Sequence, residues 1–183
     1  MRKKITTSNE ESEKPVILVI DDDRNVTATL ARILRKEARV LLANDGATGL
    51  SIIRARGDIE LVVLDITMPE YDAVELLNDM KDDGHLLPIV LFSGWRSDVM
   101  KDVARLAHYQ GFPIRAILEK PVDGRQIVEA LNNQSVSDGQ LRECIKHFGE
   151  DIAVTRRDIS VEPVDSTLQL NCMCFRRSNL SAT

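Results

Sequence analysis

The sequence has no long hydrophobic run. Its longest apolar stretch, Leu86–Phe92, has seven residues and includes Pro88, whereas a membrane-spanning helix needs about 20 apolar residues. The basic residues at positions 2–4 are not followed by an apolar core, so we expect no secretory signal. These two absences predict a protein without a membrane partner.

Cysteine is scarce and occurs only late in the chain, at Cys144, Cys172 and Cys174. An odd number of cysteines without a repeated spacing favours a reducing compartment, and we therefore expect the cytoplasm. Cys172 and Cys174 are not accompanied by a histidine or by a second cysteine pair, so the sequence predicts no metal site there.

The sequence also lacks an excess of positive charge. It contains 24 Lys and Arg against 29 Asp and Glu, which gives a net charge of −5. General affinity for nucleic acid depends on cationic side chains that neutralise phosphates. No helix-turn-helix pattern with a basic recognition helix follows residue 134, so we expect no direct DNA binding.

The chain contains several short apolar runs. The runs Val16–Ile20 and Leu61–Leu64 are continuous, as is typical of strands that are buried on both faces of a parallel sheet. Shorter strands are predicted at 40–43, 88–92 and 116–118. Apolar residues at helical spacing predict helices around 26–34, 50–53, 74–80, 99–107 and 127–131.

This alternation of strands and helices predicts the fold. Five strands and five helices within about 120 residues indicate an α/β protein with helices on both faces of a parallel sheet. Because crossover connections are right-handed, few topologies remain. We expect the common doubly wound, flavodoxin-like five-stranded sheet, with strand order 2-1-3-4-5.

Acidic residues follow two neighbouring strands of that predicted sheet. Asp21, Asp22 and Asp23 come directly after the first strand, and Asp65 ends the central one. Adjacent carboxylates repel one another unless they share a cation, although Asp23 could instead serve the N-terminus of the next helix. Several carboxylates around one point form a hard oxygen site that suits Mg²⁺.

The fourth and fifth strands bring Ser93 and Lys120 to the same edge of the sheet. A carboxylate such as that of Asp65 can act as a nucleophile and form an aspartyl phosphate. Lys120 could hold a phosphoryl oxygen as a point charge, and the hydroxyl of Ser93 could hydrogen-bond the same group. Each residue alone has a simpler explanation, such as helix capping or charge neutralisation. The combination at four strand ends favours phosphoryl chemistry.

Residues 15–134 resemble the receiver domain of bacterial two-component response regulators, including the chemotaxis receivers. Four motifs carry the resemblance, and they occur in the family's order: Val16–Asp23, Leu64–Pro69, Phe92–Gly94 and Leu118–Pro121. They are similar to the family's first strand with its acidic pair, its phosphorylation loop, its switch hydroxyl and its lysine-proline motif.

The resemblance implies a role for each matching residue. Asp65 would accept a phosphoryl group from a sensor histidine kinase or a phosphotransfer protein. Asp21, Asp22, Asp65 and the backbone carbonyl of Thr67 would bind Mg²⁺. Ser93 and Lys120 would contact the phosphoryl group. The chain would be a signalling switch rather than a turnover enzyme, and phosphorylation could drive formation of a homodimer. The downstream output protein is not implied.

Three positions depart from the family pattern. Ala73 stands where family members usually have glycine, which is a mild change. Many receivers have an aromatic residue three positions before the lysine, where this chain has Ile117. The chain therefore has no aromatic ring at this position to couple to the hydroxyl of Ser93. Trp95 is a bulky residue at a position that can shield the phosphoryl group from water.

The segments outside the receiver region have a different composition. Residues 1–14 are polar and predict a disordered lead-in. Residues 135–183 predict a linker and a short tail, with one helix at Leu141–Phe148. Glu162–Asp165 and Phe175–Arg177 resemble the opening of EAL-type cyclic-di-GMP phosphodiesterase domains, which some receivers precede. A catalytic barrel needs at least about 200 residues, so a remnant of an output domain is the most we expect.

An enzyme is the alternative function. Asp21-x-Asp23 after an apolar strand also resembles the nucleophile motif of haloacid-dehalogenase-type phosphatases. That family has threonine or valine where Asn25 stands, and an acidic motif after a late strand. Here Lys120–Pro121 occupies the late strand end, which favours the receiver.

Overall fold

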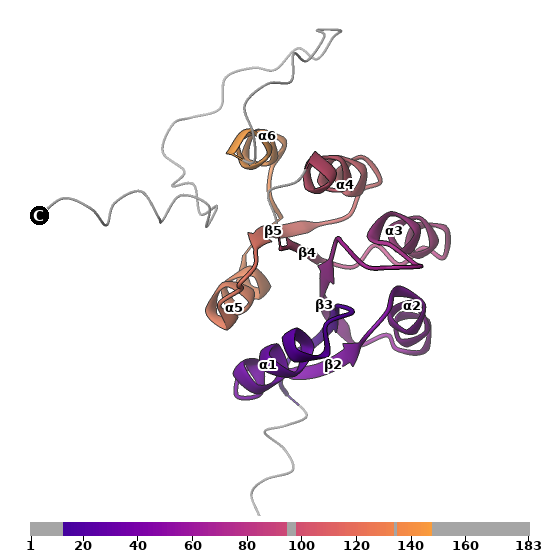
Figure 1. The fold of residues 1–183 in the computed structure, drawn as a ribbon, viewed down its shortest axis with the longest axis vertical. Helices are drawn as coiled ribbons and strands as arrows, with labels where there is room; N and C mark the ends of the chain where they lie inside the picture. Colours follow the sequence, from indigo (N-terminus) through magenta and orange to yellow (C-terminus); the bar gives the residue numbers. More distant parts are fainter. Residues whose placement is uncertain (1–12, 95–97, 134, 148–183) are drawn as a thin grey trace, which may run out of the picture.

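The computed structural model describes residues 13–94, 98–133 and 135–147 (Figure 1). The expectations for residues 1–12, for Trp95 and for residues 148–183 lie outside these ranges. In the described ranges, no helix combines the length and the apolar composition that crossing a membrane requires.

A single parallel sheet forms the centre of the described fold. Its strand order is β2-β1-β3-β4-β5, which confirms the predicted topology. The strands are β1 (Val16–Ile20), β2 (Arg39–Ala43), β3 (Ile59–Asp65), β4 (Ile89–Ser93) and β5 (Ile114–Glu119). Every residue of β1 is buried, and in β3 only Glu60 is exposed. Burial on both faces explains why these two strands are continuous apolar runs in the sequence.

Helices cover both faces of the sheet (Figure 1). One hydrophobic core lies between the sheet and helices α2, α3 and α4, and a second lies between the sheet and helices α1 and α5. Their bounds are α1 (Arg24–Leu34), α2 (Gly46–Ala55), α3 (Ala73–Asp82), α4 (Asp98–Tyr109) and α5 (Gly124–Asn132). The alternation of faces follows from right-handed crossovers on either side of β1.

Aspartates cap four of these helices. Asp23, Asp45, Asp72 and Asp123 accept hydrogen bonds from backbone amides in the first turns of α1, α2, α3 and α5. Such caps satisfy amides that have no partner within the helix. The alternative role for Asp23, at a helix N-terminus, is therefore the one the structure shows.

The C-terminal side of the fold differs from the sequence prediction. β5 begins at Ile114 rather than at Ala116, because Ile114 is buried and pairs with Ile89. Helix α6 (Asp138–His147) begins three residues before the predicted Leu141. Ser137 and Gln140 explain this start, since each side chain hydrogen-bonds the other's backbone amide, as in a capping box.

Helix α6 is packed against the sheet unit. Leu141 is 4% exposed and belongs to the core on the α4 side, where Val136 packs beside it. The amide of Val136 donates to the carbonyl of Ile114 at 2.8 Å, and Figure 1 shows α6 beside α4 at the β5 end of the sheet. Val136 and Leu141 therefore lie C-terminal to the predicted domain boundary at residue 134, although they belong to the packing of the sheet unit.

Candidate functional site

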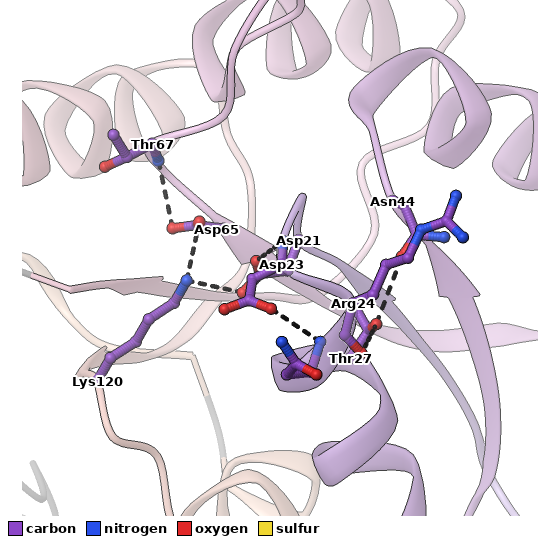
Figure 2. A network of polar contacts seen from close by, with 9 residues as sticks. Asp21, Asp23, Arg24, Thr27, Asn44, Asp65, Thr67 and Lys120 are labelled. Atoms are coloured by element: carbon purple, nitrogen blue, oxygen red, sulfur yellow. Dashed lines mark hydrogen bonds and ion pairs between the residues drawn. The ribbon is translucent and has the colours of Figure 1, made fainter.

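The predicted site residues meet at the carboxyl edge of the sheet. Asp21 follows β1, Asp65 ends β3, Ser93 ends β4 and Lys120 follows β5. These four strands are consecutive in the sheet, so their ends lie side by side. Figure 2 shows the side chain of Lys120 reaching from its loop towards Asp21 and Asp65. Open α/β sheets bind their ligands at this edge, where the strand order reverses around β1 and β3.

Lys120 forms ion pairs with both buried carboxylates. Its Nζ lies 2.7 Å from Oδ2 of Asp21 and 2.9 Å from Oδ2 of Asp65. The side chains of Asp21 and Asp65 are 0% and 3% exposed, whereas that of Lys120 is 21% exposed. A buried carboxylate requires a partner charge or a cation, and Lys120 supplies that charge to two of them.

Backbone amides fix the other oxygen of each carboxylate. Oδ1 of Asp21 accepts from the amide of Asp23 at 2.8 Å, and Oδ1 of Asp65 accepts from the amide of Thr67 at 3.2 Å. Each carboxylate is thus held by an amide on one oxygen and by Lys120 on the other (Figure 2). The two groups therefore have a fixed orientation towards each other.

The pKa values of this site reflect burial and pairing. Burial raises the pKa of Asp65, as does the neighbouring charge of Asp21, against the opposing effect of Lys120. Burial alone would lower the pKa of Lys120, but hydrogen bonds to Asp21 and Asp65 outweigh it and raise that pKa. The lysine is therefore held in its charged form.

Three carboxylates of the site could share a cation. Oxygen atoms of Asp21, Asp22 and Asp65 all lie within 4.8 Å of one another, and Asp22 is exposed. Carboxylate oxygens are the ligands that Mg²⁺ prefers, together with water. The donor set fits that ion, and the exposed carboxylate gives it access from solvent. Asp23, which caps α1, is not part of this cluster.

The remaining predicted residues are placed as follows. Ser93 is buried at the end of β4, and its carbonyl accepts from the amide of Lys120 at 2.8 Å. Ile117 is 3% exposed and lies in the core on the α4 side of the sheet. Trp95 lies outside the described residues.

Two contacts near the site were not predicted from the sequence. The ammonium of Lys120 lies 4.7 Å from the centre of the Phe92 ring, which is within range of a cation–π interaction. Thr27 is buried and donates to the carbonyl of Arg24 at 3.1 Å, with Oδ1 of Asn44 at 3.4 Å (Figure 2). The contacts of Lys120 with Phe92 and of Thr27 with Asn44 join side chains from separate elements, so neither has a sequence signal.

Comparisons with known proteins agree on the family. A model of the response regulator receiver domain matches residues 17–132. The response regulator MprA of Mycolicibacterium vanbaalenii is 33% identical over 154 residues, which are 81% of this chain and 60% of that protein. A probable cyclic di-GMP phosphodiesterase of Vibrio cholerae is 31% identical over 96 residues, which are 51% of this chain and 22% of that protein.

A solved structure supports the same conclusion. The response regulator receiver domain protein of Clostridium thermocellum superposes with a TM-score of 0.57 and 27% identity, covering 65% of this chain and 92% of that one. This chain spans only part of the curated relatives it matches. The family match favours the receiver over the phosphatase alternative, and it includes the strand ends that carry the acidic cluster and Lys120. The chain therefore belongs to the response regulator family of two-component systems, and residues 17–132 are its receiver domain.

Proposed function

We propose that Asp65 is the phosphoacceptor of this receiver domain. The observation that carries the proposal is the position of its carboxylate, which is buried at the end of the central strand, 2.9 Å from Nζ of Lys120 and within 4.8 Å of carboxylate oxygens of Asp21 and Asp22. Asp65 is oriented by the amide of Thr67. It is also the member of the cluster that belongs to the predicted phosphorylation loop.

The proposed reaction forms a bond between a carboxylate oxygen of Asp65 and phosphorus. The bond from phosphorus to the donor breaks, and the donor nitrogen of a phosphohistidine takes a proton as it leaves. Lys120 already contacts Asp65, so its ammonium would move only a short way to meet a phosphoryl oxygen. Ser93 would donate its hydroxyl to another oxygen of the same group.

Asp21, Asp22 and Asp65 would hold Mg²⁺ together with the carbonyl of Thr67. A bound divalent ion would neutralise charge on the phosphoryl oxygens. The chain's own residues orient the acceptor and supply the cation Lys120. The proposed donor is a sensor histidine kinase or a phosphotransfer protein, the proposed compartment is the cytoplasm, and phosphorylation would favour a homodimer.

Acetyl phosphate tests this proposal without knowledge of the kinase. The full chain, incubated with acetyl phosphate and Mg²⁺, should gain the mass of one phosphoryl group in intact mass spectrometry. Asp65→Asn, which is nearly isosteric, should gain none. Asp23→Asn is the matched control and should be labelled like the wild type, because Asp23 caps a helix outside the cluster. Loss of labelling in Asp23→Asn but not in Asp65→Asn would favour the phosphatase instead.

A further inference from the structure

The loop between β3 and α3 carries a tyrosine that the proposed chemistry does not use. The ring of Tyr71 lies against Gly46, the first residue of α2. A Cβ atom added at Gly46 would stand 2.2 Å from Cδ1 of that ring and 2.9 Å from the Tyr71 carbonyl oxygen. Only glycine leaves room for the tyrosine here. The N-terminus of α2 is therefore shaped to receive the end of the loop.

The hydroxyl of Tyr71 joins the same loop to α3. It donates a hydrogen bond to Oδ2 of Asp79, one turn before the end of that helix. Burial and this hydrogen bond both raise the pKa of Tyr71, so the hydroxyl keeps its proton and remains a donor. We call Tyr71, Gly46 and Asp79 the tyrosine clamp.

The turn that the clamp holds is strained. Glu70, directly before Tyr71, has a φ of 66° and is the only non-glycine residue with positive φ in the described ranges. An L-residue rarely adopts this conformation, and it persists where surrounding contacts impose it. The amide of Tyr71 donates to the carbonyl of Pro69 at 2.8 Å, which closes the turn. The contacts of the clamp hold Tyr71, the residue that follows this turn.

The clamped turn lies close to the site in sequence. Only Met68, Pro69 and Glu70 separate Tyr71 from Thr67. Met68 is 6% exposed and is fixed in the core, and the ring of Pro69 restricts its own backbone. The turn is thus held at Tyr71 and at Met68, which leaves little freedom to the adjacent Thr67, whose amide orients Asp65.

We propose that Tyr71 is a positioning residue that holds the carbonyl of Thr67 and the carboxylate of Asp65 in the arrangement that binds the divalent cation. This inference rests on the proposed function of the site and adds a residue outside its ligands. The tyrosine acts through the loop and touches neither the cation nor the phosphoryl group.

A second contact between α2 and α3 separates this role from simple helix packing. Nε of Arg54 in α2 lies 2.6 Å from Oδ2 of Asp83, the residue that caps the C-terminus of α3. The guanidinium also lies close enough to Asp79 and Tyr71 to interact with their charges, but it makes no hydrogen bond to Tyr71 among those of the described residues. Arg54→Gln removes the ion pair with Asp83 and keeps the hydrogen bond between Tyr71 and Asp79. Tyr109 provides a further control, because its side chain is 88% exposed and distant from the clamp in sequence.

The experiment measures Mg²⁺ affinity and stability in parallel on the full chain. Isothermal titration gives the Mg²⁺ dissociation constant, and urea denaturation gives the unfolding free energy. The variants are Tyr71→Phe, Asp79→Ala, their double mutant, Arg54→Gln and Tyr109→Phe. We expect Tyr71→Phe to raise the dissociation constant about three- to tenfold, as for the loss of one hydrogen bond. Asp79→Ala should have a similar effect, and the double mutant should add little.

Arg54→Gln should change stability but leave Mg²⁺ affinity within about twofold of the wild type, and Tyr109→Phe should change neither. A Tyr71→Phe variant that binds Mg²⁺ like the wild type would overturn the inference, and would assign the tyrosine to stability alone. Equal losses of affinity in Arg54→Gln and Tyr71→Phe would do the same.

Hydrogen exchange keeps the two proposals distinguishable. If the wild type binds no Mg²⁺, the proposed cation site fails, but the clamp can still be judged by amide exchange across residues 66–72. Faster exchange there in Tyr71→Phe, with unchanged exchange in Arg54→Gln, would support the positioning role. Unchanged exchange in both variants would exclude it.

Discussion

Lys120 determines the electrostatics of the site at the scale of single residues. It is the cation that both Asp21 and Asp65 contact, and both carboxylates are almost completely buried. Two such charges without a counterion would repel each other and would lose their hydration. The lysine therefore permits Asp21 and Asp65 to be buried before any cation or phosphoryl group arrives.

Replacing Lys120 tests this dependence. Lys120→Met should lower the unfolding free energy by about 3 kcal/mol in the presence of EDTA, because it leaves two buried carboxylates without their partner. Millimolar Mg²⁺ should restore part of the loss by binding the folded state. Urea denaturation with and without Mg²⁺ measures both effects. A variant as stable as the wild type in EDTA would show that the ion pairs contribute nothing.

Asp22 gives the complementary prediction, since it is the exposed member of the cluster. Mg²⁺ should raise the thermal unfolding midpoint of the wild type, and the rise should be smaller in Asp22→Ala. Without Mg²⁺ the two proteins should unfold at similar temperatures, because an exposed carboxylate loses little hydration on folding. Equal Mg²⁺ responses in a thermal scan would remove Asp22 from the ligand set.

The sequence identifies residues whose position depends on the backbone alone. Asp21 and Asp65 directly follow apolar strands, and Lys120 follows the last one, so the strand order brings them together. Phe92 and Tyr71 could not be identified in this way. Their contacts depend on rotamers and on close approach to other elements, and neither leaves a periodic pattern in the sequence.

At the scale of elements, the helix caps connect local sequence to the fold. Asp45 starts α2 at the carboxyl edge of the sheet, and its side chain accepts from both the amide and the hydroxyl of Thr48 at 2.6 and 2.8 Å. Both hydrogen bonds lower the pKa of Asp45, and the one from the backbone amide of Thr48 has the larger effect. The cap therefore fixes the start of α2 at Gly46.

This cap should produce a dependence of stability on pH. Because the pKa is lower in the folded state, the cap stabilises the protein above the unfolded pKa and loses its effect as the pH falls through the folded value. Asp45→Ala should cost about 1 kcal/mol at pH 7, and the difference from the wild type should shrink below about pH 4. Asp45→Asn, which caps without titrating, is the control. A difference that stays constant across urea curves at several pH values would contradict the assignment.

Element boundaries were harder to predict than element types. The apolar run at 116–118 identified the last strand, but Ile114 lies on the far side of Arg115 and joins the strand by pairing with Ile89. Similarly, residues 135–139 have the composition of a linker, yet Val136 and the helix that follows pack on the sheet. The boundaries of β5 and α6 depend on contacts with elements that are distant in the sequence, and local composition does not reveal such contacts.

At the scale of the whole molecule, the described residues form a five-stranded sheet with its flanking helices and one additional helix, α6. Leu141 of α6 and Val136 extend the core beyond α4, at the edge strand β5. The linker-like composition after residue 134 predicts that a chain ending there folds like the full chain. The packing of α6 predicts instead that such a chain loses buried apolar surface.

Two truncations compare these expectations. A chain ending at Asn133 should be less stable than a chain ending at His147 by roughly 2 kcal/mol, the value of burying one leucine side chain. Leu141→Ala in the full chain should cause a loss of the same order. Equal urea midpoints for the two truncated chains would show that α6 contributes no stability and would return the boundary to residue 134.

The central claim is that Asp65 accepts the phosphoryl group, and chemical mapping of the label tests it most directly. The chain is phosphorylated with acetyl phosphate and Mg²⁺, reduced with borohydride to convert an aspartyl phosphate to homoserine, and digested for tandem mass spectrometry. The account predicts homoserine at position 65 and at no other aspartate, with the signal absent when Mg²⁺ is replaced by EDTA. Homoserine at Asp21 or Asp23, with Asp65 unchanged, would contradict it.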